Sequence, residues 1–364
     1  MKKKTIQLVV LMLLSVVITG CAGKNDQTND SKSSSSQSEK MTRIFTDSAG
    51  RDVEIPNTIE KIAPSGPLAQ LVLYTSSPDL LVGLASPFST ESKEFIDQKY
   101  QSLPEFGQFY GKNASLNMEA LSAAEPDVVI DIGEAKKTVK EDMDKLQDQL
   151  DIPTIFIEAN LSNLPEAYQK IGELLGNTEE TDQLSAYCEK VLAQAKEVKG
   201  SLKAADQKSV YYASGNAGLN TNAEGSFHAQ VIDEVGAKNA AVGVDIVSKG
   251  AGSVVSMEQL IQWQPDYILA DSKDVYKQIT TEESWKELTA VKENRVYQIP
   301  TAPYNFLGSP PSVNRIIGIQ WLGQLIYPEQ YQLDIKQAVA EFYELFYHVK
   351  PTNDQISAVL ENAQ

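Results

Sequence analysis

One short sequence pattern occurs twice in the chain, 139 residues apart. The first copy joins Asn117-Met118-Glu119 to Pro126-Asp127 and an apolar run, and the second joins Ser256-Met257-Glu258 to Pro265-Asp266 and another apolar run. Each copy is typical of a short helix, capped by Asn or Ser with an acid in its first turn, followed by a turn and a buried strand. We therefore expect two similar α/β lobes, with a ligand bound in the space between them.

The first 21 residues resemble a bacterial export signal. Lys2, Lys3 and Lys4 precede a mostly apolar stretch over residues 6–18, which is shorter than the about 20 residues of a membrane-spanning helix. Gly20-Cys21 resembles the lipobox of bacterial lipoproteins, in which the cysteine becomes the lipidated first residue. A fatty acid such as palmitate at Cys21 would anchor the chain to the outer face of the cell membrane without spanning it. The alternative is a plain secretory signal with an incidental cysteine.

The chain is expected to divide into five segments. They are the signal peptide 1–20, a lipidated cysteine and disordered tether 21–42, an N-terminal lobe 43–177, a bridging helix 178–203, and a C-terminal lobe with C-terminal helices 204–364. The tether is rich in Ser, Asn, Asp and Lys and has nothing to bury. The bridging helix is predicted because Leu184, Cys188, Val191 and Ala195 recur at helical spacing without proline.

The net charge and the cysteine content restrict the partners. Residues 1–20 contain three lysines and no acid, so the processed chain would carry 29 basic and 49 acidic side chains and a net charge of −20. This charge opposes binding to nucleic acid. Only Cys188 would remain beside a lipidated Cys21, and we expect it to be buried and unreactive. No disulfide within the chain is therefore expected, and we expect a monomer.

Over nearly the whole processed length the chain resembles the substrate-binding lipoproteins of ABC importers for iron complexes and cobalamin. The resemblance rests on residues 46–51 and 53–56, the two Met-Glu patterns, and residues 235–239 and 309–315. It implies an α/β fold of two lobes joined by one rigid helix, a ligand held in the cleft, and little closure of the lobes. It also implies an ABC permease and its ATPase as partners, no intrinsic cofactor and no enzymatic activity.

In this family a glutamate on the outer surface of each lobe docks against basic residues of the permease. The resemblance places these glutamates at Glu119 and Glu258. The alternative is that each acid only stabilises the dipole of its helix, by about 0.3 to 1 kcal/mol. A dipole explains an acid in either helix but does not require the same position in both, so docking is the favoured interpretation.

The ligand is expected to be a chelated metal, most plausibly an iron complex such as a ferric siderophore, with haem or a corrinoid as alternatives. A bare metal ion is disfavoured because the chain has only two histidines, His228 and His348, and His348 is expected to be packed or exposed in the C-terminal helix and not to be a ligand. A chelate needs only aromatic walls and a few donors, which loops at the carboxyl ends of strands can supply. The candidate residues are Ser65, Pro67, Tyr110, Glu134, Asn220, His228, Tyr304, Asn305, Phe306 and Arg315.

Several of these candidates have a second interpretation. Tyr110 and Tyr304 combine a stacking face with a hydroxyl group, but each could pack only its own loop. Arg315 could meet an anionic chelate or form a structural pair between the lobes. His228 could contact the ligand or only begin a helix.

Two other classes of protein share some of these features. An anchored extracellular enzyme is disfavoured because the sequence has no Gly-x-Ser-x-Gly, His-Glu-x-x-His or Walker glycine motif, although 49 acids always offer pairs for glycosidase chemistry. A surface adhesin or metal chaperone on the same scaffold would share every feature except the need for a permease.

Overall fold

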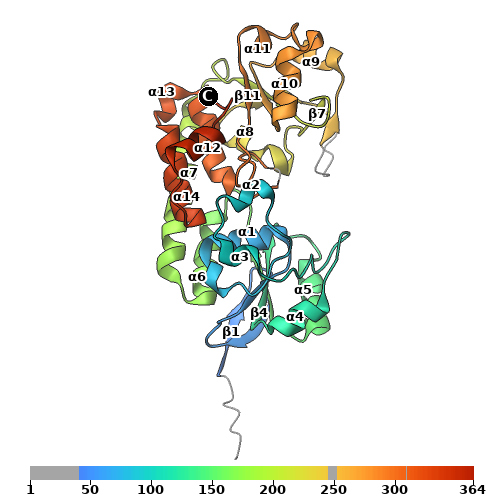
Figure 1. The fold of residues 1–364 in the computed structure, drawn as a ribbon, viewed down its shortest axis with the longest axis vertical. Coiled ribbons are helices and arrows are strands. Elements are labelled where there is room, and N and C mark those ends of the chain that lie inside the picture. Colours follow the sequence, from blue (N-terminus) through green and yellow to red (C-terminus); the bar gives the residue numbers. More distant parts are fainter. Residues whose placement is uncertain (1–40, 245–251, 309) are drawn as a thin grey trace, which may run out of the picture. The chain divides into compact units, whose positions relative to one another are not determined.

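Two parallel sheets, one in each half of the chain, form the frame of the structure (Figure 1). The computed structural model describes residues 41–244, 252–308 and 310–364. The predicted signal peptide, the lipidation site Cys21 and the tether up to residue 40 lie outside the described residues. From residue 41 onward the described chain belongs to one compact unit.

The N-terminal lobe begins with a hairpin, formed by β1 (Thr42–Thr46) and β2 (Asp52–Pro56). Its parallel sheet has the order β3-β4-β5, with β3 (Ile62–Pro64), β4 (Val128–Gly133) and β5 (Thr154–Glu158). The helices are α1 (Pro67–Ser76), η1 (Pro78–Leu80), α2 (Thr90–Lys93), α3 (Gln98–Gln101), α4 (Met118–Ala124), α5 (Val139–Leu150) and α6 (Leu164–Leu175). The strands β4 and β5 are almost entirely buried, as expected of a parallel sheet covered on both faces.

The C-terminal lobe has a parallel sheet of order β11-β10-β6-β8 and a small antiparallel pair, β7 with β9. Its strands are β6 (Ser209–Ala213), β7 (Asn220–Thr221), β8 (Lys238–Asn239), β9 (Ser253–Val254), β10 (Tyr267–Ala270) and β11 (Val296–Gln298). Its helices are η2 (Phe227–Ala229), α8 (Gln230–Glu234), α9 (Met257–Trp263), α10 (Lys273–Thr281), η3 (Glu283–Trp285), α11 (Thr289–Lys292), α12 (Asn314–Ile326), α13 (Pro328–Tyr331), α14 (Ile335–Tyr347) and α15 (Asn353–Val359).

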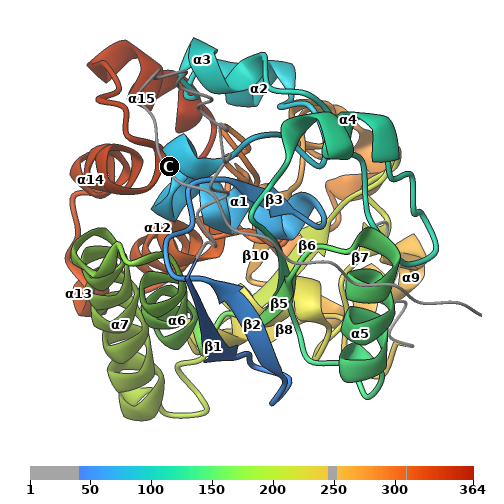
Figure 2. The ribbon, with the colours of Figure 1, turned by 90° about the horizontal axis from the view of Figure 1, so that it is seen from below.

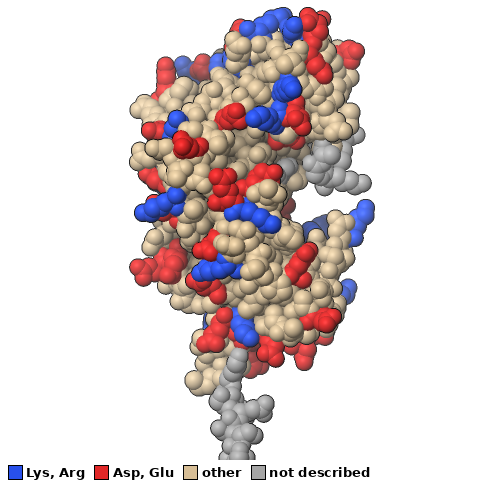
Figure 3. All heavy atoms as spheres, viewed as in Figure 1, with Lys and Arg blue, Asp and Glu red and all other residues tan. Residues whose placement is uncertain are grey.

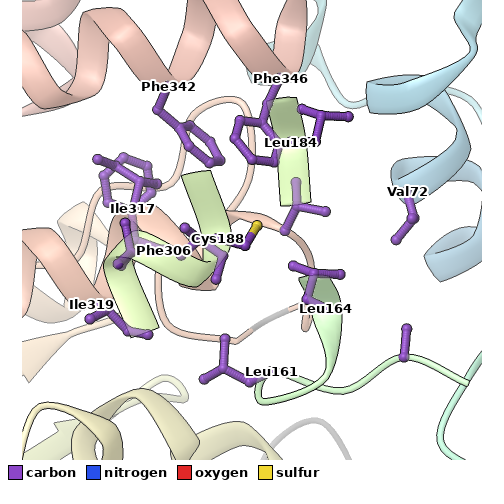
Figure 4. Packing of buried hydrophobic residues seen from close by; sticks show 14 of the residues in the cluster. Val72, Leu161, Leu164, Leu184, Cys188, Phe306, Ile317, Ile319, Phe342 and Phe346 are labelled. Atoms are coloured by element: carbon purple, nitrogen blue, oxygen red, sulfur yellow. The ribbon is translucent and has the colours of Figure 1, made fainter. Parts of the chain in front are cut away.

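The long helix expected over residues 178–203 is α7 (Thr178–Ser201). It packs against α6 and α1 of the N-terminal lobe and against α8, α12 and α13 of the C-terminal lobe, and Figure 2 shows it running beside α6. Figure 4 shows Leu184 and Cys188 of α7 among Phe342 and Phe346 of α14 and Leu164 of α6. The Cys188 side chain is fully buried, and this burial raises the pKa of its thiol. The bridging helix therefore belongs to a core that includes residues of both lobes.

The repeated sequence pattern has the same local structure in both lobes. Asn117 caps α4 by accepting a hydrogen bond from the amide of Ala120, and Ser256 caps α9 in the same way through the amide of Gln259. Both helices end in a residue with left-handed backbone conformation and lead into a central strand, β4 or β10. The prediction of two equivalent helix-strand units is therefore confirmed.

The aspartate of each Pro-Asp turn joins its strand to the neighbouring parallel strand. The carboxylate of Asp127 accepts hydrogen bonds from the amides of Glu60 and Lys61 at 2.9 and 3.0 Å, just before β3. The carboxylate of Asp266 accepts from the amide and the hydroxyl of Ser209 at 2.8 and 2.9 Å, at the start of β6. Backbone amides at the start of a strand are thus satisfied by the same residue of the repeat in each lobe.

None of the helices in the described ranges is long and apolar enough to cross a membrane. Acidic and basic side chains are interspersed over the face shown in Figure 3. The same view shows a hollow at one edge of the unit, between its upper part and its lower part.

Candidate functional site

The loops that follow the strands of both sheets carry most of the predicted ligand-binding residues. In the N-terminal lobe Ser65 follows β3 and Glu134 follows β4. In the C-terminal lobe Asn220 begins β7, directly after the turn that follows β6, and Tyr304 lies in the segment after β11. Carboxyl ends of parallel strands meet at one edge of a sheet, where open α/β folds bind ligands.

The structure brings three predicted residues of the N-terminal lobe together. Ser65, Pro67 and Tyr110 line a cavity of about 170 Å³. Two residues that the sequence analysis did not single out, Asp131 and Lys136, line the same cavity. The lining of this cavity therefore includes the hydroxyl groups of Ser65 and Tyr110, the buried carboxyl group of Asp131 and the exposed amine of Lys136.

Asp131 is the centre of the hydrogen bonds in this cavity. Its Oδ1 accepts a hydrogen bond from the hydroxyl of Ser65, and its Oδ2 accepts one from the hydroxyl of Tyr110 at 2.7 Å. Burial raises the pKa of Asp131, against the two hydrogen bonds and the charge of Lys136, which lower it. Burial, together with the charge of Asp131, also raises the pKa of the Tyr110 phenol. Tyr110 is therefore neutral and directs its proton at Asp131 whenever that carboxyl is ionised.

The N-terminus of α1 forms another wall of the cavity. Residues 65–69 line it, and within the described chain no side chain caps the helix, which begins with Gly66 and Pro67 and has no acid in its first turn. The amide groups of an uncapped first turn carry a partial positive charge and favour an anion. Lys136 adds a full positive charge on the same cavity.

Arg315 provides a buried positive charge in the C-terminal lobe. Its side chain is almost fully buried near the start of α12, its Nη1 donates to Oε1 of Gln230 at 2.7 Å, and its guanidinium carbon lies 4.6 Å from the centre of the Phe227 ring. Burial lowers the pKa of Arg315 to about 10, against the charge of Glu134, which raises it. Arg315 therefore keeps its charge at neutral pH. Its Nε is buried and has no hydrogen-bond partner among the described residues.

The interaction between Arg315 and Glu134 relates the two lobes at the site. Glu134 lies three residues after Asp131, in the loop that follows β4, and its side chain is exposed. Its negative charge acts on a guanidinium group held by the other lobe. An electrostatic interaction therefore connects the loop after β4 with the start of α12.

His228 lies in η2, next to the ring that supports Arg315. Its Nδ1 is 2.5 Å from the carbonyl oxygen of Gly308. Because a carbonyl oxygen only accepts, Nδ1 carries the proton and Nε2 of the neutral ring is an acceptor. The structure therefore places His228 at a helix start and also beside the Phe227 ring, at 5.9 Å between ring centres.

Four other predicted ligand contacts have structural roles. The Asn305 side chain accepts from the amides of Leu307 and Gly308, the Phe306 ring is fully buried in the core, and the partly buried Tyr304 packs against the same core. Asn220 pairs through its backbone with Ser214 and closes the turn after β6. Ligand contact by these four residues remains a prediction, and the cavity of the N-terminal lobe does not include them.

Larger cavities of about 410 and 570 Å³ lie beside His348, at the end of α14. They are lined by acids such as Asp79 and Glu180 and lie away from the carboxyl ends of the strands. His348 is exposed, follows α14 as its C-cap residue and has its ring 6.1 Å from that of Tyr74. Among the described residues no group of three or more His, Cys, Asp or Glu side chains could hold a metal ion.

The two glutamates of the repeated pattern are exposed. Glu119 lies in the first turn of α4 and Glu258 in the first turn of α9. Hydrogen bonds from its own backbone amide and from Ser256 lower the pKa of Glu258, so this carboxylate is charged at neutral pH. Each lobe thus presents one carboxylate at an equivalent position.

Asp131, Lys136, Phe227 and Gln230 were missed by the sequence analysis. Asp131 had a recognisable signal, because it is the only charged residue in the otherwise apolar strand β4. An unsatisfied charge in a buried strand is costly, so such a residue usually has specific partners or a function. Phe227 and Gln230 had no comparable signal, since their role depends on contact with Arg315, 85 residues from Gln230 in the sequence.

A model of the family described as periplasmic binding protein matches residues 76–303. The molybdate-binding protein MolA of Haemophilus influenzae is 26% identical over 353 residues, which cover 88% of this chain and 96% of that protein. The Fe(3+)-citrate-binding protein YfmC of Bacillus subtilis is 21% identical over 292 residues, which cover 79% and 86% of the two chains. The solved structure of an ABC transporter solute binding protein from Sulfurospirillum deleyianum superimposes with a TM-score of 0.79 at 29% identity, covering 88% of this chain and 99% of that one. The predicted α/β fold of two lobes is thereby confirmed.

Proposed function

Since the chain belongs to the periplasmic binding protein family, we propose that it captures an anionic metal chelate, most plausibly an iron complex such as a ferric siderophore, and delivers it to an ABC permease. Proteins of this family are extracytoplasmic solute-binding components of ABC transporters, which work with a permease and an ATPase. They bind a solute and are not enzymes, and they carry no intrinsic cofactor.

The observation that carries the proposal for the ligand is the environment of Arg315. A buried guanidinium group with an unpartnered nitrogen is costly unless a ligand completes its hydrogen bonds. The uncapped start of α1 and Lys136 add positive potential at the cavity of the other lobe. An anionic ligand that contacts both walls would satisfy these groups together.

A chelate fits these walls better than a bare cation does. The described residues offer no cluster of metal ligands, whereas the Phe227 and Tyr110 rings and the hydroxyl groups suit the organic part of a complex. Haem or a corrinoid on the same scaffold would use the same aromatic surfaces. A relative named for Fe(3+)-citrate supports an anionic iron complex.

A small oxyanion is the second candidate. The relative named for molybdate covers most of this chain, and Arg315, Lys136 and the uncapped start of α1 would bind an oxyanion without any aromatic contact. The cavity of about 170 Å³ at the N-terminal wall is small enough for such an ion. The two candidates differ in whether the rings contribute to binding.

We also propose that Cys21 is lipidated and anchors a monomer to the cell membrane, and that Glu119 and Glu258 dock on basic residues of the permease. The motif Gly20-Cys21 supports the anchor. The exposed, equivalent positions of the two glutamates support docking.

A thermal-shift screen of the protein against ferric citrate, ferric hydroxamates, haem, cobalamin and molybdate tests the ligand class. A ligand that binds only the folded state stabilises it by RT ln(1 + [L]/Kd), about 2.7 kcal/mol at 100 times Kd. We expect stabilisation by at least one iron complex and none by the metal-free chelator. Stabilisation by molybdate alone would replace the chelate with the oxyanion.

A further inference from the structure

The hydroxyl groups of Ser65 and Tyr110 both point their protons at one carboxyl group. Ser65 donates to Oδ1 of Asp131 and Tyr110 donates to Oδ2. While Asp131 is ionised it can only accept, so neither hydroxyl can donate to a ligand. Only the oxygen lone pairs of Ser65 and Tyr110 are then available to the cavity, and lone pairs repel the oxygens of an anion.

An anionic ligand beside an ionised Asp131 would place two negative charges side by side, and the surrounding charges do not favour this. Lys136, in the loop after β4, is the cation that acts on Asp131, and Asp142 of α5 acts on it with the opposite sign. The elements β3 and α1, which pack beside β4, contain no charged side chain. The one charged residue of β5 is Glu158, which pairs with Gly133, two residues after Asp131 on β4. Burial already raises the pKa of Asp131 in the free protein.

We propose that Asp131 is a positioning residue that takes up one proton from solvent when an anionic ligand binds beside Tyr110. This inference rests on the proposed function, because it requires an anionic ligand. The proton goes to Oδ2 of Asp131, which then donates to the phenolic oxygen of Tyr110. The Tyr110 hydroxyl turns its own proton away from Asp131 and donates it to a ligand oxygen.

Proton uptake makes binding depend on pH in a definite direction. Above the pKa of Asp131 in the free protein, affinity for an anionic ligand falls as pH rises, by up to about tenfold per pH unit for one linked proton. Below that pKa the carboxyl is already protonated and the dependence disappears. Protonation of Asp131 therefore favours ligands with an oxygen that accepts a hydrogen bond from Tyr110.

The test is isothermal titration calorimetry of the full-length protein in detergent with ferric citrate and with molybdate, between pH 5 and 8, in buffers of different ionisation enthalpy. The variant Asp131→Asn keeps the shape of the side chain, and its amide group can donate to Tyr110 at every pH. On binding the ligand, we expect wild-type protein to take up as much as one proton more than Asp131→Asn does. The affinity of the variant should depend on pH only as far as the ligand itself changes its protonation. Asp142→Asn, which removes a nearby charge outside the hydrogen-bond chain, should keep the linked proton, with its pH range moved downward because the charge of Asp142 raises the pKa of Asp131.

Tyr110→Phe provides an independent check, because it breaks the chain without changing a charge. We expect weaker binding and no linked proton, and full proton uptake by this variant would overturn the proposal. Equal proton uptake by wild-type protein and Asp131→Asn would also overturn it while leaving the proposed function intact. Failure of both probes to bind wild-type protein at every pH would remove the anionic ligand class and this inference together.

Discussion

The guanidinium carbon of Arg315 lies 4.6 Å from the centre of the Phe227 ring, in contact with its face. Phe227 begins η2 and Arg315 lies near the start of α12, so two segments far apart in the sequence fix the position of one positive charge. Stacking and the hydrogen bond to Gln230 hold the group with little remaining freedom. A fixed, desolvated charge loses little entropy when a ligand binds.

Replacing Arg315 by Gln should weaken binding of an anionic complex strongly. Removing one partner of a desolvated charge pair costs about 2 to 5 kcal/mol, which corresponds to roughly 30-fold or more in Kd. The matched control is Arg295→Gln. Arg295 also stacks on a ring, Tyr267, and also has a buried Nε without a partner among the described residues, but it precedes β11 at the opposite end of the sheet. Calorimetry that found equal losses for both variants would contradict a binding role for Arg315.

Replacing Tyr110 by Phe should reduce affinity by about threefold to tenfold, because one hydrogen bond contributes about 0.5 to 1.5 kcal/mol. Tyr304→Phe is the comparison. Tyr304 packs against the core, so we expect that change to lower the free energy of unfolding more than it lowers affinity. Urea unfolding and ligand titration of both variants separate the two effects. A larger affinity loss for Tyr304→Phe would move the ligand toward the segment after β11.

Replacing Glu119 and Glu258 together by Ala should leave ligand affinity within a few fold and reduce uptake by cells. The reason is that complementary charges at an interface act on association with the partner. The control is Glu166→Ala with Glu329→Ala, which removes two exposed acids from the first turns of α6 and α13. If both double variants reduced uptake equally, a general effect of helix dipoles or surface charge would explain the result. Loss of ligand affinity in a folded Glu119/Glu258 variant would place these carboxylates at the ligand site.

Replacing Cys21 by Ala should release the protein into the medium or leave its signal peptide uncleaved. Metabolic labelling with palmitate, followed by membrane fractionation, measures both label and location. Cys188 is fully buried, so its replacement should not change the label. Membrane retention of a processed, unlabelled Cys21→Ala variant would contradict the anchor.

The elements that the sequence predicted best are those with local signals. The capped helices α4 and α9 and the long helix α7 all follow from caps or periodicity. The apolar run from Leu68 to Tyr74 was less informative. It forms the helix α1, and periodicity alone does not distinguish a buried helix from a buried strand.

The ligand site was predicted less well, because its contacts join distant segments. Ser65 and Tyr110 were expected to face a ligand, but Asp131, the charged residue of the apolar strand β4, was overlooked, and the geometry shows that it accepts a hydrogen bond from both. Phe306 was expected to form an aromatic wall, yet its ring is fully buried in the core. An aromatic residue in a loop carries no local signal that tells a core ring from a ligand-binding ring.

Crystals of the protein grown with ferric citrate, measured at the iron absorption edge, test the central claim most directly. We predict one anomalous peak in the space that Arg315 and Tyr110 face, with atoms of the chelator between the iron and the guanidinium group. A peak at any other place, or iron bound by protein side chains with no chelator around it, would contradict the account.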